Sequence, residues 1–177
     1  MKRLIVIEGF DRCGKDSLLE DLEKEGYCVL HNDLEGLPKY DKEESDFLTW
    51  LRDYVTKQIE VLNEMFETHD TIVMSRFIVS DEVYSTLFNR EHTVEKLIGN
   101  LRKDVEICNY CMLFNNYREY LKRLKMIGEE KQYDCQDFEK ISNLYQIIAD
   151  PYNTIYKYIV AEDTRKDILN NFLKYYR

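Results

Sequence analysis

The sequence contains few of the residues that interrupt regular structure. Only two of its 177 residues are proline and six are glycine, and no low-complexity or repetitive tract divides the chain. Because linkers and disordered segments are rich in such residues, the composition favours one continuous folded unit. We therefore expect residues 1–177 to form a single domain with a sizeable core.

Long apolar runs and an excess of positive charge are also missing. No run approaches the roughly 20 residues of a transmembrane helix, and a strand is expected from Leu4, which leaves no room for a signal peptide. The net charge of −9 disfavours broad contact with nucleic acid but does not exclude a local basic cleft. We expect a cytoplasmic protein without membrane contact, whose partners are small molecules.

The strongest pattern lies at the N-terminus. Residues 4–7 are consecutive apolar residues, typical of a strand buried on both faces. The segment GFDRCGK follows at 9–15, and apolar residues at helical spacing begin at Leu18. This is the phosphate-binding pattern G-x-x-x-x-G-K in its strand–loop–helix context. Backbone amides would converge on a phosphate at a helix N-terminus, and Lys15 would reach the outer phosphates. The alternative is a purely structural turn.

The residue after Lys15 departs from the usual pattern. Serine or threonine normally stands there and contacts Mg²⁺ through its hydroxyl, whereas this chain has Asp16 followed by Ser17. A carboxylate is also an oxygen ligand for Mg²⁺, so Asp16 is a candidate metal ligand. It is equally a helix N-terminal carboxylate favoured by the macrodipole. The sequence leaves both interpretations open.

The five cysteines are an odd number, and we expect free thiols. Cys108 and Cys111 have the spacing of metal ligands, but no second pair completes a zinc site. They lie in the apolar run 107–114, which predicts a strand, so we expect both to be buried. Cys13 is either a thiol activated by neighbouring amides or a small residue that fits its loop.

Strand and helix patterns alternate along the rest of the chain. Further strands are expected at 27–30, 71–74, 107–114 and 155–160, and helices at 47–66, 93–103, 117–125, 138–148 and 168–176. Polar loops are expected at 31–45 and 128–136. This alternation predicts an α/β fold, a doubly wound parallel sheet of about five strands with helices on both faces.

Three motifs resemble the thymidylate kinase family. IEGFDRCGK at 7–15 is similar to the family's E-G-x-D-x-x-G-K, and SRFIVSDEVY at 75–84 is similar to its D-R-Y-x-x-S segment. Leu121-Lys122-Arg123 falls where the family's lid begins. The resemblance implies a P-loop kinase domain with a lid-like segment at about 118–136. It also implies ATP- and Mg²⁺-dependent phosphoryl transfer to a deoxynucleoside monophosphate, either dTMP or a modified pyrimidine analogue.

The resemblance assigns roles to individual residues. The catalytic residues would be Lys15, Arg12 and Asp11. Lys15 would neutralise the transferred phosphoryl group, Arg12 would stabilise its charge, and Asp11 would sit near the sugar of the acceptor monophosphate. Arg12 matches a class of these kinases that lacks basic lid residues, and residues 128–130 are poor in cations. Arg123 would lie against the adenine. The remaining ATP contacts would be Gly9, Cys13, Gly14, Asp16 and Ser17, with Asp16 at the metal, and the acceptor contacts would be Asp11, Phe47, Arg52, Arg76 and Tyr84.

Two departures leave other functions open. Ser75 stands where the family has an acidic residue, and the expected phenylalanine and arginine four positions apart are replaced by Phe47, Trp50 and Arg52 at other spacings. One alternative is a kinase that acts on a hydroxyl of a deoxynucleoside or of a modified base in DNA. Another is a nucleotide-binding module without catalysis. The sequence does not decide between a monomer and a homodimer.

Overall fold

The computed structural model describes residues 1–31 and 47–176, so the polar loop expected at 31–45 lies outside the described residues apart from His31. Five parallel strands form one sheet in the order β2-β3-β1-β4-β5. They are β1 (Lys2–Gly9), β2 (Cys28–Leu30), β3 (Thr71–Ser75), β4 (Val105–Phe114) and β5 (Thr154–Ile159). The prediction of a five-stranded parallel α/β fold is confirmed.

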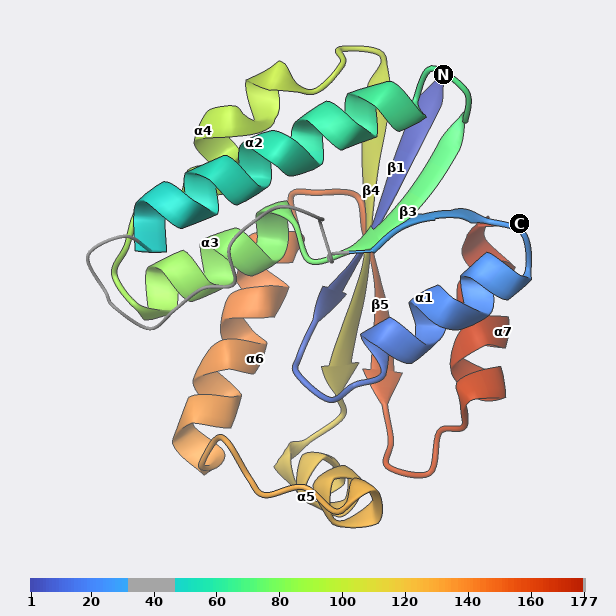
Figure 1. The fold of residues 1–177 in the computed structure, drawn as a ribbon. Coiled ribbons are helices and arrows are strands. Elements are labelled where there is room, and N and C mark those ends of the chain that lie inside the picture. Colours follow the sequence, from blue (N-terminus) through green and yellow to red (C-terminus); the bar gives the residue numbers. More distant parts are fainter. Residues whose placement is uncertain (32–46, 177) are drawn as a thin grey trace.

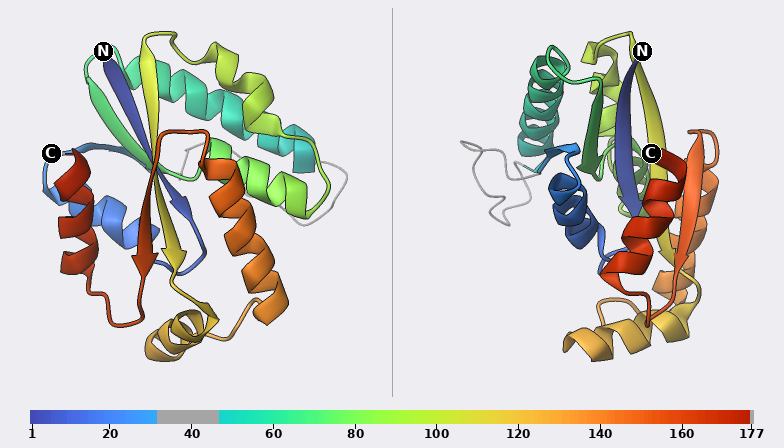
Figure 2. Two further views of the ribbon diagram at one scale, coloured as in Figure 1. Left: turned by 180° about the vertical axis from the view of Figure 1, so that it is seen from behind. Right: turned by 90° about the vertical axis from the view of Figure 1, so that its right-hand side faces the viewer.

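Helices cover both faces of this sheet. They are α1 (Lys15–Lys24), α2 (Phe47–Met65), α3 (Ile78–Leu87), α4 (Thr93–Leu97), α5 (Tyr117–Ile127), α6 (Cys135–Ala149) and α7 (Arg165–Tyr176). In Figure 1, α1 and α7 lie on one side of the sheet, and α2, α3, α4 and α6 lie on the other. Helix α5 lies beyond the C-terminal ends of β1, β4 and β5, as both views in Figure 2 also show.

The centre of the core is β1. Leu4, Ile5, Val6 and Ile7 are fully buried, because β1 pairs with β3 on one side and β4 on the other while helices cover both of its faces. Four apolar residues in succession are therefore required, since neither face of the strand meets water. The strand delivers Gly9 and the loop after it to the edge of the sheet where α5 lies.

Two helices differ from the sequence predictions. The helix expected at 93–103 ends at Leu97 and continues only as a 3-10 turn to Asn100. Asn63 of α2 holds the following chain in place, because its side chain donates to Asn100 O (3.0 Å) and accepts from Arg102 N (3.0 Å). Helix α3 was not predicted as a helix, and no side chain of its own first residues caps it.

The cysteines and the membrane prediction can also be compared with the structure. Cys108 and Cys111 are buried and all five cysteines are free, as expected. Within residues 1–31 and 47–176, no helix is long and apolar enough to cross a membrane.

Gly9 should tolerate no side chain. Its φ is 121°, and a Cβ built there would lie 2.0 Å from Met112 O of β4. We expect Gly9→Ala to lower the free energy of unfolding by on the order of 2–3 kcal/mol, measured by denaturant titration. Gly99→Ala is the matched control, because nothing lies within 4 Å of its Cβ position. Equal stability of the two variants would contradict this packing.

Candidate active site

The loop from Gly9 to Lys15 is curled by three residues with positive φ. These are Gly9 (121°), Arg12 (65°) and Gly14 (94°). The loop is tied to β4 through Phe10 N, which donates to Met112 O at 3.0 Å. The left-handed residues turn the chain back so that it enters α1 directly. The N-terminus of α1 therefore opens toward the space that the loop encloses, which is the arrangement that binds phosphate.

Lys15 lies inside this curl and only 4% of it is exposed. Its Nζ donates to Gly9 O (3.1 Å) and Phe10 O (2.5 Å), so the ammonium is held at the base of the loop. Cys13 is buried beside it and its Sγ donates to Phe10 O at 2.8 Å. Burial raises the pKa of the Cys13 thiol despite the nearby Lys15 charge. Of the two interpretations, the small residue that fits its loop is the one the structure supports.

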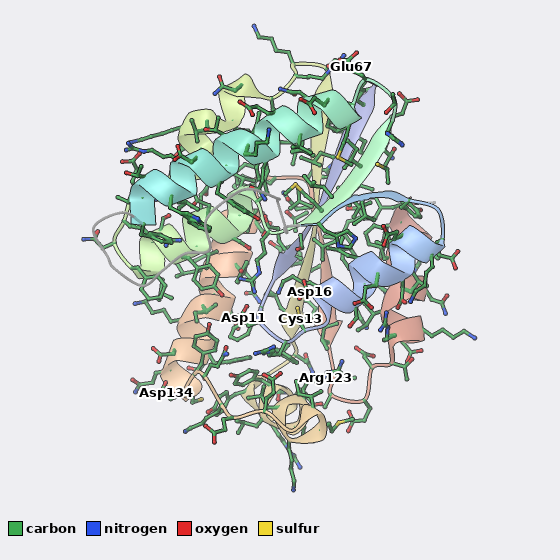
Figure 3. The ribbon with its side chains drawn as sticks, in the orientation of Figure 1. Asp11, Cys13, Asp16, Glu67, Arg123 and Asp134 are labelled. Atoms are coloured by element: carbon green, nitrogen blue, oxygen red, sulfur yellow. The ribbon has the colours of Figure 1, made fainter. Side chains whose placement is uncertain are left out.

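A pocket of about 460 Å³ opens over the loop. Four cations and three carboxylates lie on its wall. Its lining residues are Asp11, Arg12, Gly14, Lys15, Asp16, Ser17, Arg76, Arg123, Ile127, Glu129 and Gln132. Figure 3 shows Asp11, Cys13 and Asp16 around the loop, with Arg123 at α5 below them. Such a concentration of cations at a helix N-terminus suits a polyphosphate.

Asp11 connects three parts of the molecule. It forms an ion pair with Arg76, which follows β3, and accepts hydrogen bonds from the hydroxyls of Tyr133 (2.9 Å) and Tyr84 (3.4 Å). Burial disfavours the charged carboxylate, but the positive charges of Arg76 and Lys15 outweigh it and hold the pKa of Asp11 below its usual value. Asp11 is therefore an ionised anchor for Arg76.

Arg76 lines a second pocket, of about 290 Å³, as well as the first. This second pocket is mostly apolar and aromatic. Its lining residues are Trp50, Leu51, Tyr54, Val55, Gln58, Arg76, Phe77, Ser80, Asp81, Tyr84, Arg90 and Val94. The two pockets thus share one arginine on their walls; the first pocket is rich in cations and the second in aromatic side chains.

The structure does not bring every expected acceptor residue into the second pocket. Phe47 and Arg52 are absent from the described residues that line it. Arg52 instead pairs with Glu91 at 2.9 Å on the surface, and Phe47 lies under the guanidinium of Arg90, with 4.8 Å between Cζ and the ring centre. Arg90 lines the pocket beside Arg76, so a second arginine is present, but not the expected one.

The segment 128–134, between α5 and α6, closes over the loop. Glu129 pairs with Arg12 at 2.7 Å, while Tyr133 bonds Asp11 and its carbonyl accepts from the Tyr117 hydroxyl at 3.2 Å. Two adjacent residues of the phosphate loop, Asp11 and Arg12, therefore contact the segment 128–134 at two positions. Neither Glu129 nor Tyr133 was predicted as a site residue, because their partners lie more than a hundred positions away in the chain.

Arg123 approaches the same pocket from α5. Its Nη1 donates to Ala161 O (3.3 Å) and Asp163 O (3.4 Å), in the turn after β5. Its Nε is buried and has no hydrogen-bond partner among the described residues. The side chain is thus fixed at the wall of the pocket by two backbone carbonyls.

The residues around Asp16 fit a magnesium ion that arrives with phosphates. Asp16 is exposed at the start of α1, lines the first pocket, and its side chain has no hydrogen-bond or ion-pair partner among the described residues. Mg²⁺ in nucleotide sites is typically held by one or two carboxylates together with the phosphates and water. Among the described residues, no cluster of three His, Cys, Asp or Glu side chains forms a protein-only metal site. Ser75 is 3% exposed at the end of β3 and lines neither pocket.

The low pKa of Asp11 makes a prediction about acid stability. The contribution of this ion pair is present above the usual carboxyl pKa of 3.8 and is lost as the pH falls through the lower pKa of the folded state. Asp11→Asn should therefore lose less unfolding free energy than the parent protein between about pH 5 and pH 2. Asp53→Asn, at an exposed position on α2, is the control. A parallel pH dependence in all three proteins would refute the assignment.

Comparison with known proteins identifies the fold. No protein-family model and no curated protein sequence matches the chain. The solved structures include the thymidylate kinase of Candida albicans, with 13% identity, TM-score 0.62, and 98% of this chain and 90% of that chain covered. The deoxyadenosine kinase of M. mycoides with dCMP and dCDP bound has 15% identity, TM-score 0.57 and 98% coverage of both chains. The YorR protein of Bacillus subtilis, in complex with phosphorylated GDP, has 16% identity, TM-score 0.58, and 98% and 95% coverage. The chain therefore has the fold of P-loop nucleoside and nucleotide kinases, as its motifs suggested.

Proposed function

We propose that this protein is a kinase that transfers a phosphoryl group from ATP to a deoxynucleoside monophosphate, dTMP or a modified pyrimidine analogue. The observation that carries the proposal is that Arg76 lines both the cationic pocket and the aromatic pocket. A phosphoryl group passing between two nucleotides needs a cation at the point where their phosphates meet. In this proposal the larger pocket takes the ATP phosphates and the second pocket takes the acceptor.

The donor side is supported by the residues around the phosphate loop. Lys15 is held at the base of the phosphate loop, from which it would reach the outer phosphates, and Arg12 lines the same pocket. Magnesium, bound through Asp16 and the phosphates, would offset charge on the phosphate oxygens. Arg123, fixed by the turn after β5, would contact the adenine. The segment 128–134 acts in this proposal as the lid of a single domain.

The acceptor side is supported by the composition of the second pocket. Trp50 and Tyr54 stack at 5.2 Å between ring centres and give one wall an aromatic surface that suits a nucleobase. Arg76 and Arg90 supply two cations at the same pocket, which suits an acceptor that already carries a phosphate. A neutral nucleoside would not need both.

A deoxynucleoside kinase is the second candidate function. The deoxyadenosine kinase of M. mycoides (TM-score 0.57, 15% identity) and the thymidylate kinase of Candida albicans (TM-score 0.62, 13% identity) resemble this chain to a comparable degree, so the fold does not separate the two acceptor classes. The separating experiment incubates the purified protein and γ-labelled ATP with nucleosides, nucleoside monophosphates and DNA that contains modified bases. Transfer to deoxynucleoside monophosphates supports the proposal, transfer to nucleosides or to DNA replaces it, and transfer to none indicates a binding module.

Lys15 should be necessary for turnover. We expect Lys15→Ala to lower kcat/KM by roughly a hundredfold or more, because a cation that faces the transferred group is lost. Lys24→Ala, in the last turn of the same helix with its side chain 71% exposed, should leave the rate unchanged. Circular dichroism checks that both variants are folded. A Lys15→Ala enzyme with near-normal turnover would reject the assignment of this loop.

Arg12 and Arg123 should affect different kinetic constants. Arg12→Ala removes a cation near the transferred group, so kcat should fall by roughly tenfold or more. Arg123→Ala removes the proposed adenine contact, so the KM for ATP should rise while kcat stays within about twofold. Steady-state kinetics at saturating acceptor measures both. An Arg12→Ala variant that changes only the KM would reduce Arg12 to ground-state binding.

A further inference from the structure

Glu8 is a buried carboxylate with no role in the proposed transfer. It lies in β1, directly before Gly9, and is fully buried. Burial raises the pKa of Glu8, although hydrogen bonds from Ser80, Phe77 and Val79 favour the charged form. A carboxylate in a sheet interior is costly unless its oxygens are satisfied, so its partners indicate what it does.

The partners of Glu8 all belong to the start of α3. Oε1 accepts from Phe77 N (2.9 Å) and Val79 N (3.1 Å), and Oε2 accepts from Ser80 N (3.1 Å) and from the Ser80 hydroxyl. The Ser80 hydroxyl also lies 3.1 Å from the Tyr145 hydroxyl of α6. These backbone groups are the ones that a helix leaves unpaired at its N-terminus. Because α3 has no side-chain cap of its own, Glu8 supplies the cap from another strand.

Arg76 lies directly before this cap and has an unusual backbone. Its φ is 57°, a left-handed conformation that costs a non-glycine residue on the order of 1 kcal/mol and persists only where the surroundings impose it. Two residues of β1, Ile7 and Glu8, impose this conformation. Arg76 N donates to Ile7 O at 3.0 Å, and Glu8 holds Phe77 immediately after it. β1 therefore fixes Arg76 on both sides.

We propose that Glu8 is a positioning residue that fixes Arg76 and the first turn of α3, and so sets the shape of the second pocket. Phe77, Ser80 and Tyr84, on or just before α3, line that pocket together with Arg76. The strand that delivers the phosphate loop thus also places the acceptor side. The effect on turnover rests on the proposed function, whereas the effect on the pocket does not.

Glu8→Gln tests this inference with little change in side-chain volume. The amide keeps one oxygen but replaces the other with a donor, which leaves N–H groups of α3 unpaired. Trp50 is the only tryptophan and lines the second pocket, so its fluorescence reports on that pocket without any ligand. We expect the acrylamide quenching constant of Trp50 to change by about twofold and the KM for dTMP to rise about tenfold. ATP affinity should change less, because Arg76 lines both pockets but Arg12, Lys15 and Arg123 also line the ATP side.

Two further variants separate positioning from general destabilisation. Phe66→Leu changes a fully buried residue just after α2, near the start of β3 and away from both pockets; it should lower the melting temperature without changing Trp50 quenching. Tyr145 lines neither pocket, and Tyr145→Phe removes the hydroxyl that faces Ser80. This variant should change Trp50 quenching in the same direction as Glu8→Gln, but by less. If Glu8→Gln does not fold, Tyr145→Phe carries the test.

The outcomes distinguish the inference from the proposed function. If Glu8→Gln and Tyr145→Phe both lose stability while Trp50 quenching matches the parent protein, Glu8 is only a structural cap and the inference is wrong. If the parent protein phosphorylates no acceptor but Trp50 quenching changes as expected, the inference holds and the proposed function fails. If quenching changes and the ATP and dTMP constants change equally, Glu8 does not act selectively on the acceptor side and the inference is overturned.

Discussion

The ion pair between Asp11 and Arg76 is the interaction on which the rest of the site depends. One partner belongs to the phosphate loop after β1 and the other follows β3, the neighbouring strand. Parallel strands end at the same edge of a sheet, so their C-terminal residues meet there. Because Arg76 also lines both pockets, this pair determines where the two pockets meet. Tyr84 and Tyr133 bond the same carboxylate and bring α3 and the segment 128–134 to that point.

The first pocket has more positive than negative side chains on its wall, although the protein as a whole is acidic. The chain carries a net charge of −9, yet its first pocket gathers Arg12, Lys15, Arg76 and Arg123. Arg12 pairs with Glu129 and Arg76 pairs with Asp11, while Lys15 and Arg123 donate to backbone carbonyls. Each contact fixes a side chain before a phosphate binds, which lowers the cost of ordering it later. A polyphosphate has enough negative charge to compete with Glu129 for Arg12, and the hydrogen bonds of Lys15 go to neutral groups, the carbonyls of Gly9 and Phe10 and the Cys13 thiol.

Local patterns in the sequence predicted the sheet and the phosphate loop, because both are specified by neighbouring residues. The apolar run 4–7 predicted a strand buried on both faces. The glycines at 9 and 14 occur at the left-handed positions that the loop requires. The failures have a different cause. The helix expected to 103 ends early because Asn63 on another helix captures its backbone. The contacts of Glu129 and Tyr133 join residues that only the folded chain brings together. Glu8 lay within a recognised motif, but its partners on α3 were not deducible from the spacing.

The central claim is that two nucleotides bind with their phosphates meeting at Arg76. A bisubstrate compound, adenosine and thymidine joined through five phosphates, tests it most directly by isothermal titration calorimetry. Because one molecule would fill both pockets, the account predicts a stoichiometry of one and an affinity at least about a hundredfold above that of ATP or dTMP alone. Arg76→Ala should remove most of that advantage. A bisubstrate compound that binds no more tightly than ATP would show that the two pockets do not form one site, and would contradict the account.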